Sequence, residues 1–333
     1  MKAWHIQKYG GPEVLQFGNL PEPAVADNDV LVQIKAASIN PIDWKMRDGM
    51  MRMILKQKFP LILGNDLSGV VTATGKNVSR FSIGDEVFAR PDKHSIGALA
   101  ERIAVAEDEV AIKPPSLDFE HAAALPLVGL TSLQALTDHA RLRAGQKVLI
   151  HAGAGGVGTF AIQYARHLGA YIATTASVAK HELVKSLGAD EVIDYRTEDF
   201  SEVLADFDVV FDTLGGSELK KSVKVLKPGG IIVSVSGPPG PEFAREWSLS
   251  LPMRWVVGLM SLGIRRRAKA ADVTYRFFIM HASGEQLDTI SALVENGTLK
   301  PVVDRVFDFE HADEAIAYAE AGHATGKVIV RGT

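Results

Sequence analysis

Short apolar runs separated by turn residues fill the first third of the chain. The clearest runs are Val30–Ile34, Ser68–Thr74 and Glu86–Ala89, and glycine, proline and aspartate residues stand between such runs. Runs of this length with this punctuation are typical of strands joined by turns. The pattern therefore predicts a mostly β domain of irregular barrel type over residues 1–124.

From about residue 125 the pattern changes to short apolar strands that alternate with helical segments. The predicted strands are 147–151, 171–176, 191–193, 208–212, 231–235 and 273–279, and the predicted helices include 178–187 and 217–226. Strands that alternate with helices form βαβ units, whose strands are parallel. We therefore expect an α/β fold with a doubly wound parallel sheet over residues 125–282. A helix between Ser283 and Gly297 and a strand–helix–strand tail over 302–333 are predicted to follow it.

A glycine-rich turn joins the first strand and the first helix of this second region. Gly153, Gly155 and Gly158 have the G-x-G-x-x-G spacing and directly follow the apolar run Lys147–His151. In such a turn the first glycine permits the bend, the second lets a pyrophosphate approach the backbone, and the third lets the helix pack on the strand. The phosphates then lie at the helix N-terminus, where free N–H groups point at them. The residues expected to hold a dinucleotide are Gly153, Gly155, Gly156, Val157 and Gly158.

The end of the second strand of this region indicates which dinucleotide is bound. NAD-selective folds place an acidic residue there, about 20 residues after the glycine turn, whereas this chain has Thr174–Ser177. Ser177 can donate a hydrogen bond to a 2′-phosphate, and Lys180 adds a positive charge nearby. We therefore expect NADPH rather than NADH. The alternative is that Lys180 is only a solvated helix residue.

Composition and charge exclude several classes of protein. The 333 residues carry a formal net charge of −4, so a nucleic-acid partner is not expected. The chain contains no cysteine, which excludes disulfides and any thiolate zinc site. The first residues have no signal-peptide pattern, and the longest apolar stretch, Leu249–Ile264, is interrupted by Pro252 and Arg254. We expect a soluble, cytoplasmic protein.

Several longer motifs carry a resemblance to one known family. They are Ser38–Lys45, Leu63–Val71, Ala152–Gly158, Leu187–Asp190, Val192–Tyr195 and Gly326–Val328. In this order they resemble the medium-chain dehydrogenase/reductase superfamily in its zinc-independent quinone oxidoreductase branch. Within that branch, Met46–Gly49 and Tyr275–Ser283 resemble reticulon-interacting mitochondrial quinone reductases and chloroplast-envelope quinone oxidoreductase homologues. The resemblance implies a GroES-like catalytic domain from residues 1–124 and 283–333, a Rossmann NADP(H)-binding domain from 125–282, and a homodimer.

The resemblance also implies roles for residues around the cofactor. It implies that Lys180 and Tyr195, together with Ser177, hold the 2′-phosphate of NADPH. The residues that it implies beside the nicotinamide are Thr131, Ser236, Gly237, Phe277 and Phe278. These roles rest on the family pattern alone.

The zinc positions of related enzymes are replaced in this chain. Zinc-dependent members of the superfamily carry a cysteine where this chain has Asn40, and Gly-His-Glu where it has Gly64–Asp66. Without a metal as Lewis acid, we expect hydride to go to electron-poor acceptors, either quinones or α,β-unsaturated carbonyl compounds. One alternative is an NADPH-binding protein with a structural or regulatory role and no catalysis. A zinc-type alcohol dehydrogenase is a disfavoured alternative.

The motif that begins at Asn40 holds the candidate catalytic residues. Family members often have a tyrosine just after the Asn-Pro pair, where this chain has Trp44. Lys45 is therefore the candidate for bonding the nicotinamide ribose or the acceptor oxygen. Asn40 is the candidate for fixing the ribose or the acceptor, and Asp43 and Asp66 are candidates for orienting Lys45.

Each of these residues also has a simpler interpretation. Asn40 with the proline after it is typical of a turn, Asp43 is typical of a helix cap, and Asp66 could satisfy the backbone donors of a turn. The proton that completes the reduction could come from water, because hydroquinone oxygens are readily protonated by solvent.

An apolar insert between the fifth and sixth predicted strands admits two interpretations. Trp247–Met260 is rich in tryptophan and methionine, and the basic run Arg265–Lys269 follows it. One interpretation is a lid over the nicotinamide, with peripheral contact of the apolar and basic residues to an anionic membrane. The other, which we favour, is a helix packed on the Rossmann domain or in a dimer contact, followed by a solvated basic turn.

Overall fold

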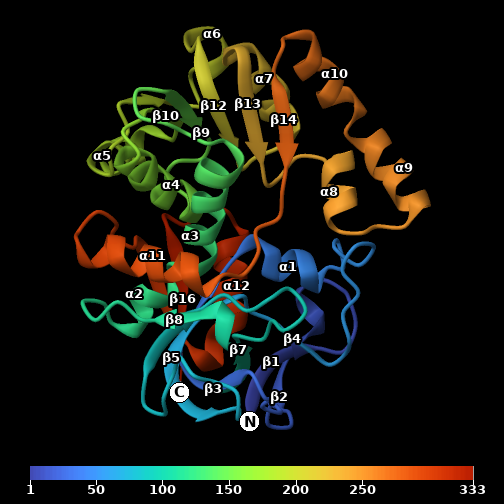
Figure 1. Cartoon of the computed structure of the whole chain (residues 1–333), viewed down its shortest axis with the longest axis vertical. Coiled ribbons are helices and arrows are strands. Elements are labelled where there is room, and N and C mark those ends of the chain that lie inside the picture. Colours follow the sequence, from blue (N-terminus) through green and yellow to red (C-terminus); the bar gives the residue numbers. More distant parts are fainter. Residues whose placement is uncertain (333) are drawn as a thin grey trace. The chain divides into compact units, whose positions relative to one another are not determined.

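The computed structural model describes residues 1–332, which divide into two compact units. The first unit consists of Met1–Leu130 and of the chain from His281 onward, and the second is Thr131–Met280 (Figure 1). Each unit has a hydrophobic core of its own. Thr333, the last residue of the predicted tail, lies outside the described residues.

The first unit is built on a mostly antiparallel sheet that unites the two ends of the chain. Its strands have the order β15–β16–β3–β5–β6–β8, and β7 also pairs with β3. Their bounds are β3 Asp29–Ile39, β5 Asp66–Thr74, β6 Glu86–Ala89, β7 Arg102–Ala106, β8 Val110–Ile112, β15 Val303–Asp308 and β16 Lys327–Arg331. Strand β16 is antiparallel to β3, with Val328 opposite Ile39. The C-terminal strands therefore complete the sheet of the first unit.

The burial pattern of β3 shows why this part of the chain forms strands. Val30, Val32 and Ile34 are buried, whereas the residues between them are partly exposed. This period of two is that of a strand with one face on the core. The predicted β-rich character is confirmed.

Smaller elements complete the first unit. A second sheet has the order β2–β1–β4. The bounds are β1 Lys2–Ile6, β2 Leu15–Asn19, β4 Leu61–Ile62, α1 Pro41–Arg47, α2 Phe119–Ala123, α3 Pro126–Leu133, α11 Gly284–Glu295 and α12 Ala312–Glu320, with 3₁₀ turns at Pro12–Val14, Glu107–Glu109 and Phe309–His311. Helix α3 begins in the first unit, but from Thr131 onward its residues belong to the second unit, where it continues as a π-helix over Gln134–His139.

A parallel sheet in the order β11–β10–β9–β12–β13–β14 forms the second unit. Its strands are β9 Lys147–Ile150, β10 Tyr171–Thr175, β11 Glu191–Ile193, β12 Phe207–Asp212, β13 Leu226–Ser234 and β14 Thr274–Phe277. The helices are α4 Gly156–His167, α5 His181–Ser186, α6 Phe200–Val203, α7 Gly216–Val225, α8 Pro241–Glu246, α9 Leu251–Met260 and α10 Leu262–Ala270. The chain winds from the central β9 to both sides, which is the doubly wound Rossmann order. The predicted fold is therefore confirmed.

Some predicted elements differ in detail from the structure. The predicted helix 178–187 is a 3₁₀ turn, Val178–Lys180, followed by the short α5. The strand predicted from Ile231 begins at Leu226, because Leu226 already pairs with Phe207 before the chain turns at Gly229, which has φ +82°. The apolar insert Trp247–Met260 contains the helix α9, as expected, but the basic run Arg265–Lys269 lies in a further helix, α10, rather than in a turn.

Candidate functional site

The glycine turn between β9 and α4 is packed tightly at its first and third glycines. A Cβ atom at Gly153 would lie 2.1 Å from Oγ1 of Thr174, and one at Gly158 would lie 2.3 Å from the carbonyl oxygen of Ala152. Real Cβ atoms do not approach other atoms so closely, so both positions require glycine. The structure therefore explains two glycines of the motif by packing of the strand, turn and helix.

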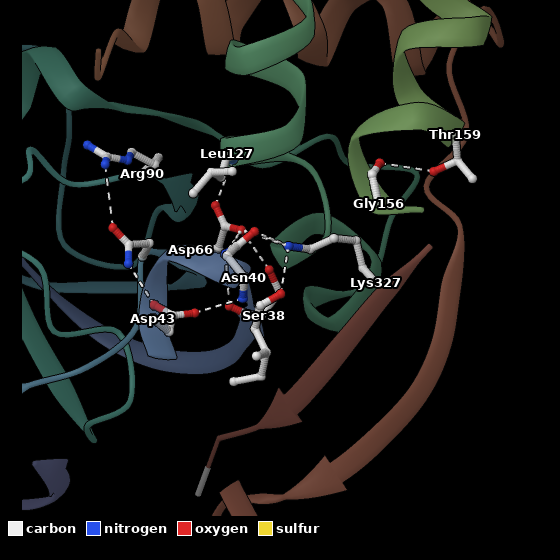
Figure 2. A network of polar contacts seen from close by, with 11 residues as sticks. Ser38, Asn40, Asp43, Asp66, Arg90, Leu127, Gly156, Thr159 and Lys327 are labelled. Carbon is white, nitrogen blue, oxygen red and sulfur yellow. Dashed lines mark hydrogen bonds and ion pairs between the residues drawn. The ribbon is translucent and has the colours of Figure 1, made fainter. Parts of the chain in front are cut away.

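The second glycine of the turn is different. A Cβ atom at Gly155 would have one neighbour within 4 Å, the carbonyl oxygen of Ala152 at 3.3 Å. Gly155 is the N-cap of α4, and helix geometry leaves the first-turn N–H groups, including those of Gly156, Val157 and Gly158, without intrahelical partners. The hydroxyl of Thr159 donates to the carbonyl of Gly156 and ties this turn together (Figure 2). Open space beside free amides fits a pyrophosphate.

The residues expected at the 2′-phosphate follow two neighbouring strands. Ser177 and Lys180 come after β10, and Tyr195 comes after β11. The amide of Ala176 donates to the carbonyl of Ile193 at 3.0 Å, which holds these two strand ends side by side. Lys180 has no ion-pair partner within residues 1–332, and Tyr195 is 59% exposed.

Arg196 is an addition to this group that the sequence reasoning missed. Its guanidinium carbon lies 5.7 Å from the centre of the Tyr195 ring. The signal was available, because a basic residue directly follows the tyrosine that the family pattern implies. Lys180 and Arg196 thus give the carboxyl edge of β10 and β11 two cations, which suits a phosphate.

A buried carboxylate fixes the turn that follows β13. Asp212 accepts hydrogen bonds from the hydroxyl of Ser234 at 2.6 Å and from the amide of Gly215 at 2.9 Å. The Ser234 hydroxyl oxygen in turn accepts from the amide of Gly237 at 2.8 Å, and the hydroxyl of Ser236 donates to the carbonyl of Thr213. Ser236 and Gly237 therefore have a fixed backbone at the carboxyl edge of the sheet.

The other residues expected beside the nicotinamide are more enclosed. Thr131 is buried, and Phe278 is buried with its ring 4.4 Å from the ring of His139. The ring of Phe277 packs edge-on against Phe243 at 5.1 Å. Both phenylalanines thus have packing partners within the second unit.

A cluster of buried polar side chains lies in the first unit around Asn40 (Figure 2). The ammonium group of Lys327 donates to the side-chain oxygen of Asn40, and its Nζ lies 3.3 Å from Oδ2 of Asp66. The Asn40 amide donates to the same carboxylate oxygen at 2.8 Å, as does the hydroxyl of Ser38 at 2.7 Å. The other Asp66 oxygen accepts from the amide of Leu127. Every polar atom of the Asn40 side chain is therefore engaged.

Asp43 joins this cluster to Asn65. It lies in the first turn of α1, where one carboxylate oxygen accepts from the backbone amide of Asn40 at 2.7 Å. The other accepts from the side-chain amide of Asn65 at 2.6 Å. Burial raises the pKa of Asp43 to about 6. Asp43 thus serves as a helix-capping residue and also connects both residues that stand at zinc positions in related enzymes.

Arg90 is a second buried cation near Asn65. It is 4% exposed, and its Nη2 lies 3.4 Å from the side-chain oxygen of Asn65 while Nη1 donates to the carbonyl of Pro91 at 2.7 Å. Its Nε is buried without a hydrogen-bond partner in the described chain. Burial lowers the pKa of Arg90. The guanidinium is therefore only partly satisfied by the protein.

Lys45 stands apart from these contacts. Its side chain is partly buried, which lowers its pKa, and it forms no hydrogen bond or ion pair with another residue in the range 1–332. The structure thus brings Asn40, Asp43 and Asp66 into one cluster but does not connect Lys45 to them. Its amino group is available for a ligand.

Family models and relatives match this arrangement. A model described as alcohol dehydrogenase GroES-like domain matches residues 26–115, and one described as zinc-binding dehydrogenase matches residues 187–330. The Mus musculus protein "NAD(P)H oxidoreductase RTN4IP1, mitochondrial" is 38% identical over 357 residues, covering 99% of this chain and 89% of the relative. The chain belongs to the medium-chain dehydrogenase/reductase superfamily.

Two further matches agree with the predicted quinone oxidoreductase branch of this superfamily. The Arabidopsis thaliana "NADPH-dependent alkenal/one oxidoreductase, chloroplastic" is 36% identical over 341 residues, covering 99% of this chain and 79% of the relative. The solved structure of a quinone oxidoreductase from Coxiella burnetii superposes with a TM-score of 0.87 at 34% identity, covering 100% of this chain and 99% of that chain. The predicted resemblance is therefore confirmed.

One of the matching family models is described as zinc-binding, but this chain lacks the usual zinc ligands at the positions that hold zinc in related enzymes. Asn40 and Asn65 replace the thiolate and imidazole that zinc prefers. In residues 1–332 no group of three or more histidine, cysteine, aspartate or glutamate side chains is arranged to hold a metal ion. The positive charge of Lys327, rather than an ion, lies against Asn40 and Asp66. The residues present do not fit a zinc ion.

Proposed function

We propose that this chain reduces quinones or α,β-unsaturated carbonyl compounds with NADPH and without a metal. The observation that carries the proposal is the bonding of Asn40, whose side-chain oxygen accepts from Lys327 and whose amide donates to Asp66. An ammonium group at this place has no lone pair for a metal. Conjugated carbonyl compounds and quinones take hydride without a Lewis acid, which makes them the acceptors that suit this site.

The second unit supplies the cofactor site in this proposal. NADPH supplies the hydride when it is bound. Gly155 and the first-turn amides of α4 hold its pyrophosphate, and Ser177, Lys180 and Tyr195 hold its 2′-phosphate. The residues proposed to line the nicotinamide side are Thr131, Ser236, Gly237, Phe277 and Phe278. The support for the 2′-phosphate site is the unpaired cation of Lys180 beside a strand end that carries no acidic residue.

The first unit supplies the groups that orient the reactants. Asn40 fixes the ribose or the acceptor, and its direction is set by Lys327 and Asp66. Asp43 is a positioning residue for Asn40, because its carboxylate accepts from the Asn40 backbone amide. Lys45 donates a hydrogen bond or a proton to the oxygen of the reduced acceptor.

A Lys45→Ala variant tests the proposed donor. We expect kcat with an enone to fall by about a hundredfold, the lower range for loss of a general acid, with little change in KM for NADPH. Arg52→Ala, which removes an exposed cation from the same region, is the matched control. Wild-type turnover in Lys45→Ala would mean that water supplies the proton.

The proposed reaction is tested by NADPH oxidation with an ortho-quinone and with an enone. We expect turnover with at least one of them, and slower turnover when NADH replaces NADPH. A protein that binds NADPH, as measured by calorimetry, but oxidises it with neither acceptor would instead be a binding protein with a structural or regulatory role.

We also propose a homodimer that acts in the cytoplasm. The support for the dimer is β14, which pairs with β13 on one side and has no strand partner on its other side within residues 1–332. A free strand edge can pair with its copy about a twofold axis. Light scattering after gel filtration tests the dimer. Cell fractionation tests the location, and enrichment in an organelle would contradict it.

A further inference from the structure

The helix α9 exposes an unbroken apolar surface. Its exposed large apolar residues are Leu251 (70%), Trp255 (75%), Val256 (44%), Leu259 (67%) and Met260 (59%). At 100° per residue, these five side chains and Pro252 occupy one half of the helix circumference, and no polar residue falls in that half. Soluble proteins seldom expose a contiguous apolar face of this kind without a partner for it.

The position of α9 in the second unit leaves this face open. Its main packing partners within that unit are α8 and α10, and α9 and α10 follow each other along its rim (Figure 1). Arg254, the charged residue of α9, turns back so that its Nε donates to the carbonyl of Leu249 at 2.8 Å. The open face therefore keeps its apolar character.

A cluster of cations directly follows the apolar face. Arg265, Arg266, Arg267 and Lys269 are exposed on α10, and none of them forms an ion pair within the described residues. Ser261 joins the two helices, and its carbonyl accepts from the amide of Arg265 at 3.0 Å. Arg265 thus lies about one and a half helical turns beyond Met260. No acidic residue occurs between Glu246 and Asp272.

We infer that α9 and α10 form a docking surface for a membrane that contains anionic lipids. An apolar helical face with tryptophan, flanked by arginine and lysine, suits the boundary between acyl chains and negatively charged headgroups. No helix in residues 1–332 is long and apolar enough to cross a membrane, so the contact is one of a helix lying on the surface. The inference does not depend on which acceptor the chain reduces.

The positive charges of α10 favour an anionic membrane over a second copy of the chain as the partner of this surface. A twofold contact through α9 would bring the same patch of each copy together, and this patch carries the cations of α10 but no acidic residue between Glu246 and Asp272 to pair with them. Repulsion between like charges opposes that contact. Anionic lipid, in contrast, neutralises the cations and covers the apolar face at once.

Co-sedimentation of the full chain with vesicles tests the inference. We expect binding to phosphatidylcholine vesicles that contain phosphatidylglycerol, little binding to pure phosphatidylcholine, and release at high salt. The double variant Arg265→Ser/Arg266→Ser should bind about 25-fold more weakly, since each surface cation contributes about fivefold. Trp255→Ser should also weaken binding, and wild-type protein should show a blue shift of tryptophan fluorescence that Trp255→Phe lacks.

Matched variants at other surface sites are controls for a nonspecific loss of vesicle binding. Lys56→Ser/Lys58→Ser removes two exposed cations, and Ile83→Ser removes an exposed apolar side chain with 70% exposure. Both should bind vesicles as wild type does, and all variants should retain NADPH binding as evidence of folding. Equal binding to both vesicle types would overturn the inference. So would an absence of vesicle binding together with an oligomer that Trp255→Ser dissociates, which would assign the face to a second copy.

Discussion

At the scale of single residues, the buried cluster of the first unit balances two carboxylates against two cations. Asp43 and Asp66 carry the negative charges, and Lys327 and Arg90 carry the positive ones. Removing one member of a buried charged cluster leaves the others uncompensated in a poorly solvating environment. The stability of the first unit should therefore depend strongly on each of these side chains.

Lys327→Met should destabilise the protein by about 3–5 kcal/mol, because Asp66 and Asn40 lose the ammonium group that donates to them. Urea unfolding measures this change. Lys327→Arg should restore part of the loss, because it keeps a buried cation. Lys76→Met removes an exposed ion pair with Asp27 and should change the free energy of unfolding by less than about 1 kcal/mol. Similar effects of Lys327→Met and Lys76→Met would contradict the proposed importance of the cluster.

The raised pKa of Asp43 predicts that the stability of the protein depends on pH. Burial raises its pKa from an ordinary value of 3.8 to about 6, so between these values the folded chain binds a proton that the unfolded chain has released. The contribution of Asp43 to the free energy of unfolding is complete below pH 3.8 and is lost as the pH rises to about 6. The loss is at most roughly 3 kcal/mol.

Urea unfolding of wild type and Asp43→Asn across this pH range measures the contribution. The stability of wild type relative to the variant should decline as the pH rises between these two pKa values. Asp313→Asn, which changes an exposed carboxylate in the first turn of α12, should follow wild type. Parallel curves for wild type and Asp43→Asn would show that Asp43 does not titrate differently in the folded state.

At the scale of elements, two glycines of the turn between β9 and α4 are expected to have different roles. Gly153 is needed for packing, whereas Gly155 is proposed to leave space for the pyrophosphate. Gly153→Ala places a Cβ atom 2.1 Å from Thr174 Oγ1 and should lower the melting temperature, because the turn must shift. Gly155→Ala meets one backbone oxygen at 3.3 Å and should change stability less. It should nevertheless weaken NADPH binding at least tenfold, since the added methyl group fills the space of the pyrophosphate. Calorimetry measures both quantities, and unchanged NADPH affinity in Gly155→Ala would contradict the proposed phosphate site.

The glycine turn and the buried cluster show which features of the structure could be predicted from the sequence and which could not. The turn at Gly153–Gly158 was predictable because strand, glycines and helix are consecutive, so the signal is local. The contact of Lys327 with Asn40 spans 287 residues, and no local pattern marks either partner as half of a pair. Arg90 was missed for the same reason. The family motif around Lys327 pointed to the right position but not to its role.

At the scale of the whole molecule, the chain combines a unit that contains the glycine turn and a unit that contains the buried polar cluster. The first unit is formed from both ends of the chain, and its sheet requires β16 to pair with β3. Neither terminal segment could be assigned to that sheet from alternation alone, because alternation identifies a buried face and not the partner that covers it. The family pattern supplied this connection.

Ligand binding to one unit should stabilise the folded chain as a whole. A ligand that binds only the folded state adds about 2.7 kcal/mol at a concentration one hundred times its Kd, so NADPH should raise the melting temperature more than an equal concentration of NADH. Lys180→Glu should abolish most of that difference, because a carboxylate would repel the 2′-phosphate. Lys185→Glu makes the same charge change at an exposed site on α5 and should leave the difference intact. Equal shifts by NADPH and NADH in the wild-type protein would refute the assignment of NADPH, whichever acceptor the enzyme reduces.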